Sequence, residues 1–303
     1  MWRAEIYGVI QVMHRDLPQG AMTIERMCKL AGASRAGYYR AWRASAPREE
    51  EAGLRDAIQR ITLTTRNYGY RRIAAALRRE GWLANHKRVL RLMRLDNLLC
   101  QRQKPFVPIT TDSNHCWQIV PNLVRGLQVM KLDQLWVADI TYIRLAEEFA
   151  YLAVVLDAYS RKVVGWALAS HLRASVAIEA LNMALQDRRP APGTLIHHSD
   201  RGVQYASDEY RARLTAHDIQ ASMSRVGNPY DNAKAESFMK TLKAEEVDGR
   251  AYRNIQDAQR EIGEFIEKVY NRTRLHSALG YQPPTEFEVA LCPVHSAVRE
   301  AAE

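Results

Sequence analysis

The run from Tyr151 to Leu156 contains only apolar and aromatic residues, with no polar residue at alternate positions. A strand with one solvated face alternates apolar and polar residues, so an unbroken run is typical of a central strand covered on both faces. This run lies within one of five strand-like segments, which occur at 135–143, 149–157, 162–169, 194–199 and 219–222. Helical periodicity occurs at 174–186, after Ser207 and near 255–270. Consecutive strands followed by alternating helix and strand predict a mixed sheet with helices packed on its faces.

Three acidic residues occur in short contexts that are chemically specific. Asp139 lies inside the first strand-like run, which is rich in β-branched and aromatic residues. Asp200 follows the run at 194–199, and Gly202 comes after it as a turn residue. Glu236 lies in a helical stretch with an apolar stripe at i, i+3, i+4 and i+7, formed by Ala235, Phe238, Met239 and Leu242. Two strand carboxylates and one helix carboxylate can therefore converge at one edge of the sheet.

Three carboxylates at short range repel one another, and without a cation at least one is pushed toward protonation. Mg²⁺ is a hard cation that takes oxygen ligands, and two ions about 4 Å apart can serve the attacking and leaving oxygens of an in-line displacement. We therefore predict that Asp139, Asp200 and Glu236 are catalytic and bind two Mg²⁺ ions, for which Mn²⁺ can substitute. For each alone, the simpler interpretation is structural: the aspartates end strands and Glu236 pairs with Lys240. The histidine pair before Asp200 is assigned to buried strand positions, because imidazole is not a usual magnesium ligand.

Five segments around these carboxylates resemble a known family: Trp136–Tyr142, Asp157–Trp166, His198–Tyr205, Gly227–Lys243 and Tyr270–Tyr281. On these segments, residues 131–290 resemble the catalytic core of the retroviral-integrase superfamily, and more narrowly the OrfB-type transposases of the bacterial insertion-sequence-three family. The resemblance implies an RNase H-like fold with a five-stranded sheet, magnesium dependence, and an acidic triad at Asp139, Asp200 and Glu236. The sequence does not show the His/Cys zinc module that precedes the core in retroviral integrases, and its four cysteines are too scattered to form one.

Charge is unevenly divided along the chain. Residues 1–108 contain 21 Lys and Arg against 9 Asp and Glu, a net charge of +12, whereas residues 109–303 contain 22 against 25, a net charge of −3. A clustered basic region is the electrostatic footprint of nucleic-acid binding, so we predict that the N-terminal third grips DNA. The alternative is that basic helices only keep a domain soluble.

The segment Thr23–Arg40 has the pattern of a helix-turn-helix unit. One helix is followed by a tight turn at Gly32 and by a second helix that Ser34 caps. The second helix of such a unit lies in a DNA groove. The residues predicted to contact DNA here are Arg35, Tyr39 and Arg40.

A second two-helix unit follows. Its first helix, Tyr70–Glu80, ends at Gly81, and Asn85 caps the second helix, His86–Arg94. The residues predicted to contact DNA in this unit are Arg71, Arg72, Lys87, Arg88 and Arg91. Pairs of helices also serve as plain packing modules, and this interpretation stays open for both units. The segment Tyr68–Ile73 again resembles the region before the core in insertion-sequence-three transposases.

One face of the Glu236 helix carries basic residues. Asn232, Glu236, Lys240 and Lys243 recur at i, i+4, i+8 and i+11 and so align on one side. A lysine beyond a metal-binding carboxylate can engage the phosphates of a DNA end. We therefore predict that Asn232, Lys240 and Lys243 contact DNA. A solvated face of Glu–Lys pairs is the alternative.

The sequence predicts five segments, in which all-α DNA-binding units precede an α/β core. Residues 1–47 form the helix-turn-helix-like unit and 48–104 the second basic helical unit. Residues 105–131, with their prolines and polar run, form a linker. Residues 132–248 form the RNase H-like catalytic core, and 249–303 a C-terminal helix and tail that brace it. Contact of this tail with DNA is the alternative to bracing.

These features predict a DNA transposase that cleaves the ends of an insertion sequence and transfers the cut strands by direct transesterification, without a protein-linked intermediate. The resemblance implies that its partners are duplex DNA, at the element's ends and at the target, other copies of the chain in a homo-multimer, and an upstream-frame product. No apolar run is long enough to span a membrane, so we expect no membrane partner and a place in the bacterial cytoplasm, at the nucleoid. Two other classes stay open: a DNA-binding repressor with an inert core, and a metal-dependent nuclease that cleaves without joining.

Overall fold

The structure is a computed structural model that describes residues 3–18, 22–43, 49–100, 120–225 and 232–291. The chain divides into two compact units, residues 1–64 and 65–303. In the described ranges, no helix combines the length and the apolar character needed to cross a bilayer. The five segment boundaries drawn from the sequence stay predictions.

The first unit is helical and consists, where it is described, of α1 Arg3–Asp16, α2 Ile24–Leu30, α3 Arg35–Arg43 and α4 Glu49–Thr64. Thr23 Oγ1 accepts a hydrogen bond from the N–H of Arg26 at the start of α2, and Ser34 Oγ accepts one from the N–H of Gly37 at the start of α3, both at 3.3 Å. Between the helices Gly32 has a φ of +61°, a left-handed conformation that favours glycine. The predicted order of helix, turn and helix is therefore confirmed.

The second unit begins with a pair of helices, α5 Tyr70–Arg79 and α6 His86–Leu95. Asn85 Oδ1 accepts a hydrogen bond from the N–H of Lys87 at 2.9 Å, which caps α6 as predicted. Apolar residues of the two helices are fully buried: Ile73, Leu77, Val89, Leu92 and Met93. The second predicted helix pair is thus confirmed.

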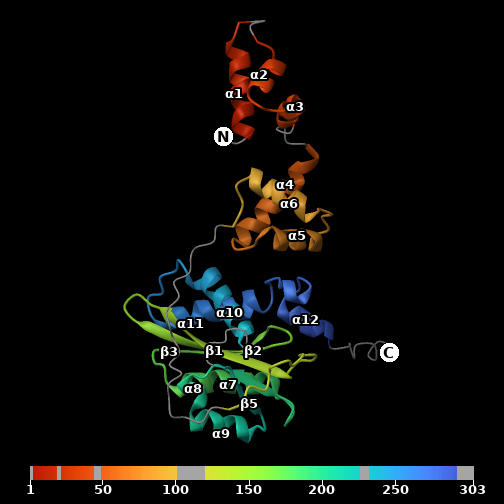
Figure 1. Cartoon of the computed structure of the whole chain (residues 1–303). Helices are drawn as coiled ribbons and strands as arrows, with labels where there is room; N and C mark the ends of the chain where they lie inside the picture. The colour runs from red at the N-terminus through yellow and green to blue at the C-terminus, as the bar shows by residue number, and fades with distance from the viewer. Residues whose placement is uncertain (1–2, 19–21, 44–48, 101–119, 226–231, 292–303) are drawn as a thin grey trace, which may run out of the picture. The chain divides into compact units, whose positions relative to one another are not determined.

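A mixed five-stranded sheet forms the centre of the second unit (Figure 1). Its strands are β1 Leu135–Arg144, β2 Phe149–Asp157, β3 Val163–Ala169, β4 Ile196–Ser199 and β5 Gln220–Met223, in the order β3-β2-β1-β4-β5. The first three strands pair antiparallel, whereas β4 pairs parallel with β1, and β5 parallel with β4. This arrangement confirms the predicted RNase H-like α/β fold.

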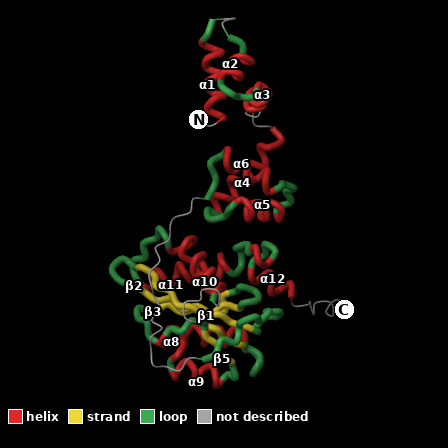
Figure 2. Tube along the Cα trace, viewed as in Figure 1, coloured by secondary structure: helices red, strands yellow, loops and turns green. Residues whose placement is uncertain are grey.

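Helices cover both faces of the sheet (Figures 1 and 2). On one face lie α10 Ala233–Leu242 and α11 Ile255–Glu264, and on the other α7 Ala174–Arg188, α8 Val203–Ala206 and α9 Asp208–Ala216. Successive residues of β2 enter opposite cores: Leu152 and Val154 pack with α10 and α11, and Ala153 and Val155 with α7 and α9. The strand is buried on both faces, as its unbroken apolar run predicts.

Two helices change their hydrogen-bonding pattern before they end. α10 continues as the π-helical segment η1, Lys243–Val247, and α11 continues as η2, Phe265–Tyr270. The helix predicted near 255–270 is therefore present but consists of two segments. Insertion of a π-turn rotates the side chains that follow relative to those of the preceding α-helix.

The C-terminal segment contacts the core through polar side chains. The N–H of Val163 donates to Asn271 Oδ1, and Asn271 Nδ2 donates to the Val163 carbonyl, each at 3.0 Å. α12, Pro284–Leu291, carries Glu288, which pairs with Arg188 of α7 and lies 3.5 Å from Lys162 Nζ. These contacts support the interpretation that the tail braces the core.

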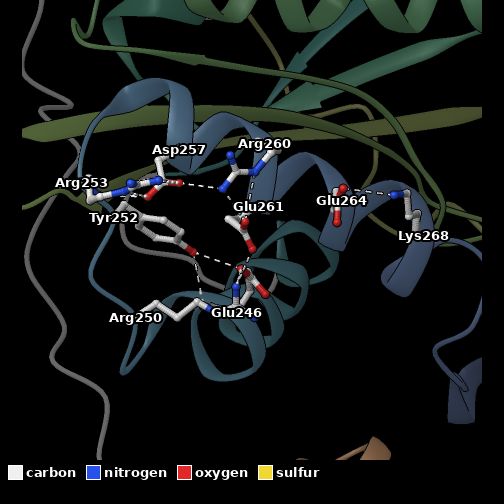
Figure 3. Close-up of polar contacts among 9 residues, drawn as sticks. All are labelled: Glu246, Arg250, Tyr252, Arg253, Asp257, Arg260, Glu261, Glu264 and Lys268. Carbon is white, nitrogen blue, oxygen red and sulfur yellow. Dashed lines mark hydrogen bonds and ion pairs between the residues drawn. The ribbon is translucent and has the colours of Figure 1, made fainter.

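A network of charged residues connects η1 with α11 (Figure 3). Arg250 Nη1 lies 2.9 Å from Glu246 Oε1 and 2.8 Å from Glu261 Oε2, and the Tyr252 hydroxyl donates to the Glu246 carbonyl at 3.3 Å. Burial raises the pKa of Glu246 to about 7, although Arg250 and Tyr252 act in the opposite direction. The other pairs drawn lie just before and along α11 and η2: Arg253–Asp257, Arg260–Asp257, Arg260–Glu261 and Lys268–Glu264.

The raised pKa of Glu246 predicts a pH-dependent stability. The folded protein holds this proton up to about pH 7, whereas the unfolded chain releases it near 4.5, so the free energy of unfolding falls as the pH rises between these values. Glu246→Gln removes the buried charge, and we expect it to raise the free energy of unfolding by on the order of 2 kcal/mol at pH 8 and by much less at pH 5. Urea unfolding at the two pH values measures the difference. Glu264→Gln, at an exposed partner of Lys268, is the control, and an equal gain at both pH values would contradict the assignment.

Candidate active site

The pairing of β4 with β1 brings two of the predicted carboxylates together. The two strands are parallel, with His198 opposite Val137. Asp200 and Asp139 each lie two residues further along, and residues two apart in a strand point to the same face of the sheet. The register therefore places the two aspartates level with each other, at the end of β4.

Backbone groups orient one oxygen of each aspartate. Asp139 Oδ1 accepts a hydrogen bond from the N–H of Ile140, and Asp200 Oδ1 accepts one from the N–H of Gly202, both at 2.9 Å. A Cβ at Gly202 would lie 3.0 Å from Asp200 Oδ1 and 3.1 Å from Gln204 Oε1. A side chain at this turn would therefore push against the carboxylate.

The histidine pair before Asp200 belongs to the core. His197 Nε2 lies 2.9 Å from the Tyr210 hydroxyl, and His198 lies between the hydroxyls of Ser222 and Ser224, at 2.9 and 3.0 Å. Burial lowers the pKa of His197 to about 3, and His198 adds to this effect, so the His197 ring is neutral. The buried position predicted for the pair is confirmed.

Glu236 lies in the first turn of α10, and this end of the helix is anchored to the sheet. Asn232 Nδ2 donates a hydrogen bond to the carbonyl of Ala138 at 2.9 Å, and Ala138 immediately precedes Asp139 in β1. Phe238, two residues beyond Glu236, is buried in the core between the helix and the sheet. The third carboxylate is thus presented from a helix end that is tied to the strand carrying the first.

The three carboxylates interact electrostatically. Burial and the neighbouring Asp200 raise the pKa of Asp139 to about 8, and Glu236 adds to the rise, while the N–H of Ile140 and Lys243 oppose it. A set of carboxylates without thiolate or imidazole ligands suits a hard divalent cation. Over the described ranges, no three Asp, Glu, His or Cys side chains are close enough together to form a complete metal-binding group. Asp200 and Glu236 thus both repel the carboxylate of Asp139, although the three do not form a complete metal site in the described part of the chain.

Tyr205 of α8 is a residue at this site that the sequence did not single out. Its hydroxyl is buried and has no hydrogen-bond partner among the residues that the structure describes. Burial raises the pKa of Tyr205, and Tyr210, Asp139 and Asp200 add to the rise, so the hydroxyl lies within electrostatic range of both aspartates. The residue ends the family-like segment that begins at His198, but sequence periodicity does not show where so short a helix directs a ring.

The residues predicted to line a basic face of α10 lie in different environments. Lys240 is exposed, with Nζ 3.7 Å from Glu236 Oε2. Lys243 is half-buried at the start of η1, with Nζ 4.3 Å from the centre of the Tyr142 ring. Asn232 is only 6% exposed, and its amide is hydrogen-bonded to the carbonyl of Ala138. Contact of these three residues with DNA stays a prediction.

The residues predicted to contact DNA from α3 and α6 lie at the surface. Arg35, Tyr39 and Arg40 are exposed, and the Arg35 guanidinium lies 6.0 Å from the centre of the Tyr39 ring. Lys87 and Arg91 are also exposed and line a surface hollow of about 460 Å³ on α6, together with Leu90, Arg94 and Leu95. Arg88 is half-buried beside them.

The two arginines predicted to contact DNA from α5 differ from each other. Arg71 is exposed, with its guanidinium 5.4 Å from the centre of the Tyr70 ring. Arg72 is half-buried, and its Nε donates a hydrogen bond to the carbonyl of Leu275 at 3.1 Å. The structure therefore gives Arg72 an internal partner, which the sequence did not predict.

Known protein families match most of this chain. An integrase core domain matches residues 131–229, a second integrase core domain model matches 217–284, and an HTH-like domain matches 48–106. Among solved structures, a simian T-cell lymphotropic virus intasome in complex with the PP2A regulatory subunit B56 gamma aligns with a TM-score of 0.43 and 15% identity, over 76% of this chain and 73% of that chain. The catalytic core of HTLV-2 integrase in complex with magnesium aligns with a TM-score of 0.39 and 15% identity, over 51% and 95%.

Curated relatives align over nearly their full length. The chain is 38% identical over 266 residues to the insertion element IS600 uncharacterized 31 kDa protein of Shigella sonnei, which covers 86% of this chain and 97% of that protein. It is 34% identical over 276 residues to the transposase InsF for insertion sequence IS3A of Escherichia coli strain K12, which covers 89% of this chain and 95% of the transposase. With an integrase core and an HTH-like domain in the same chain, this protein belongs to the family of IS3 insertion-sequence transposases.

Proposed function

We propose that this DNA transposase cleaves the ends of its element and joins them to target DNA at one active site, formed by Asp139, Asp200 and Glu236. The observation that carries the proposal is the electrostatic coupling of these three carboxylates, which come from β1, the end of β4 and the first turn of α10. Membership of the IS3 transposases supplies the reaction class.

The same carboxylates are the proposed ligands of two divalent ions, Mg²⁺ or Mn²⁺ in its place. When bound, such a pair of ions supports in-line displacement at phosphorus by stabilising the attacking and leaving oxygens. The protein's own contribution is to orient the ligands: the N–H groups of Ile140 and Gly202 each hold one carboxylate oxygen. Asn232 fixes the start of the helix that carries Glu236. The buried hydroxyl of Tyr205, which has no partner among the described residues, lies within electrostatic range of both aspartates.

The proposed reaction has two steps of the same kind. Water attacks a phosphodiester at the element's end and releases a 3′-hydroxyl, which then attacks a phosphodiester of the target. Each step forms one P–O bond and breaks another at the same phosphorus, so no covalent intermediate with the protein is needed.

The proposed partners follow from the two kinds of domain. The basic helical units hold duplex DNA, at the element's ends and at the target, in the bacterial cytoplasm at the nucleoid. Two element ends are paired by a homo-multimer, and an upstream-frame product associates with the chain or is fused to it. The net charge supports the assignment of the helical units to DNA binding, because residues 1–108 carry the chain's excess of Lys and Arg.

Two other functions make different predictions in one assay. A repressor with an inert core would bind DNA without cutting it, and a nuclease would cut without joining. The coupled carboxylates argue against a repressor with an inert core. The combination of an HTH-like domain with an integrase core argues against a nuclease that only cuts. Strand transfer of labelled element ends with Mg²⁺ separates all three.

The triad is tested by isosteric substitution in the full chain. We expect Asp139→Asn, Asp200→Asn and Glu236→Gln each to lower cleavage and strand transfer by on the order of 10³-fold or more, or about 4 kcal/mol of activation free energy. DNA affinity should stay near that of the wild type, because an amide keeps the shape but is a poor magnesium ligand. Glu264→Gln on α11 is the matched control. Substantial strand transfer by any one triad variant would remove that residue from the active site.

The lysines are tested by charge reversal. We expect Lys240→Glu and Lys243→Glu to slow cleavage of a pre-bound DNA end by about ten- to a hundredfold, because each lost charged hydrogen bond to phosphate misplaces the terminus. Single-turnover cleavage and crosslinking from each position to the terminal nucleotides are the measurements. Lys268→Glu, at an exposed lysine that pairs with Glu264, is the control. Full activity of the double variant, without a crosslink, would identify this region as a solvated helix face.

The basic hollow on α6 is tested by the salt dependence of binding. Each phosphate neutralised by the protein contributes about 0.9 to the slope of log affinity against log salt concentration. We expect Lys87→Ala and Arg91→Ala each to weaken binding of duplex DNA and to reduce this slope by about that amount. Fluorescence anisotropy over a salt series measures both quantities, with Lys268→Ala as the control. An unchanged slope in both variants would show that the DNA-binding surface lies outside α6.

A further inference from the structure

The chain just before and within α5 contacts the core at Leu275. The N–H of Leu275 donates a hydrogen bond to the Tyr68 hydroxyl at 2.8 Å, and Arg72 Nε donates one to the Leu275 carbonyl at 3.1 Å. Tyr68 and Leu275 are each 5% exposed, and the Arg72 guanidinium lies 5.6 Å from the centre of the Tyr68 ring. We name Tyr68, Arg72 and Leu275 the Leu275 clasp. The N–H and the carbonyl of Leu275 are thus both hydrogen-bonded by side chains from the segment that begins α5.

The clasp depends on the chemical identity of its side chains. A buried backbone N–H that loses its partner is costly, and phenylalanine at position 68 would fill the space without accepting the hydrogen bond. Burial lowers the pKa of Arg72, and Arg274 adds to this effect, as is expected for a guanidinium enclosed within the protein. Its contact with Leu275 gives Arg72 a structural partner in place of the DNA contact that its sequence pattern suggested.

Arg274, the residue before Leu275, links this segment to the helix that carries Glu236. Arg274 donates from Nε and Nη2 to the two carboxylate oxygens of Glu245, at 2.9 and 2.7 Å, and both side chains are largely buried. Glu245 lies in η1, the direct continuation of the helix that carries Glu236. A bidentate pair of this kind fixes the direction of both groups as well as their distance.

An aromatic contact provides a second route to the same helix. The rings of Tyr270 and Phe238 meet edge to face with their centres 4.8 Å apart, and Phe238 lies on α10 two residues beyond Glu236. The Tyr270 ring also meets His276, with ring centres 4.7 Å apart, at the residue after Leu275. The segment that receives the clasp is therefore packed against α10 as well as ion-paired to its continuation.

A surface ion pair sets the orientation of α5 at its other end. Arg79 donates to both carboxylate oxygens of Glu286 on α12, at 3.0 and 2.6 Å. Both side chains are exposed, so the pair adds little to stability. Together with the clasp, however, it gives α5 two separated points of attachment to the core, at Leu275 and at Glu286.

We infer that Tyr68 and Arg72 are positioning residues that fix the α5–α6 unit on the core, so that duplex DNA held on α6 enters the active site in one register. The inference rests on the proposed function, because it assumes DNA on α6 and chemistry at Asp139, Asp200 and Glu236. A displacement of about 1 Å in a reacting group can cost on the order of a hundredfold in rate. A DNA-binding unit can define the scissile bond only if its own position relative to the carboxylates is defined.

The test compares two tyrosines of the full-length transposase that lie two residues apart. Tyr68→Phe removes the acceptor of the Leu275 N–H, whereas the control Tyr70→Phe alters a ring that lies against His86 and Arg71. A labelled element end is pre-bound, Mg²⁺ is added, and each cut is mapped to the nucleotide under single-turnover conditions. We expect Tyr68→Phe to bind DNA with wild-type affinity, to cut the correct bond about tenfold or more slowly, and to spread its cuts over neighbouring phosphodiesters. The control should cut as the wild type does.

Arg72 supplies an independent pair of variants if Tyr68→Phe does not fold. Arg72→Ala should scatter the cuts while leaving DNA affinity unchanged, and Arg72→Lys, which can still donate to the Leu275 carbonyl, should restore part of the correct cutting. Lower DNA affinity with an unchanged cut site would overturn the inference and make Arg72 a DNA contact. Wild-type rate and cut site in Tyr68→Phe or in Arg72→Ala would also overturn it. Retention of cutting by Asp139→Asn would instead refute the proposed function, so the two failures are distinguishable.

Discussion

β4 runs parallel to β1, and the rest of the candidate active site depends on this pairing. With His198 opposite Val137, the chain that leaves β4 has to pass beside Asp139, and Asp200 takes that place. The position is electrostatically unfavourable, since burial and the second carboxylate raise the pKa of Asp139 to about 8. The fold maintains it because β1 pairs with β2 along its whole length and the histidines before Asp200 are buried with hydrogen-bond partners. Under the proposed function, a bound divalent cation would relieve this repulsion.

The third carboxylate depends on how α10 is held, because Glu236 lies in its first turn. At the start of the helix, Asn232 bonds to the carbonyl that precedes Asp139. At its end, Arg274 holds Glu245 in the continuation of the helix. A rotation or slide of α10 would carry Glu236 away from the aspartates, and these two contacts oppose both movements. Under the proposed function, this preorganisation would lower the cost of assembling the three carboxylates around an ion and DNA.

The sequence predicts the features that short-range patterns determine. The strands follow from an unbroken apolar run with alternating runs around it, and the three carboxylates from the local contexts in which they lie. The spacing of Asn232 groups it with the lysines of α10, but its amide is bound to a carbonyl 94 residues away. Arg72 does follow the helical pattern, yet its partner Leu275 is 203 residues away. Lys243 is half-buried where Lys240 is exposed, because its ammonium lies over the ring of Tyr142 on β1. A local sequence pattern cannot identify a contact partner that lies this far away in the chain.

Buried charged residues make some of these contacts between residues that lie far apart in the chain. An ion pair inside a protein is weak evidence for stability, since desolvation offsets much of the Coulomb attraction. Arg274 and Glu245 nevertheless form one, and its two parallel hydrogen bonds fix the backbone next to Leu275 in a way that an apolar pair of equal volume would not. Asp157 acts similarly at the turn after β2, where it accepts hydrogen bonds from the N–H groups of Asp133, Tyr159 and Ser160. In both places a buried carboxylate specifies the path of a nearby backbone segment, and the Arg274 segment is the one that connects the α5–α6 unit to the helix of Glu236. Both buried carboxylates orient neighbouring backbone groups, a role that does not require a large contribution to stability.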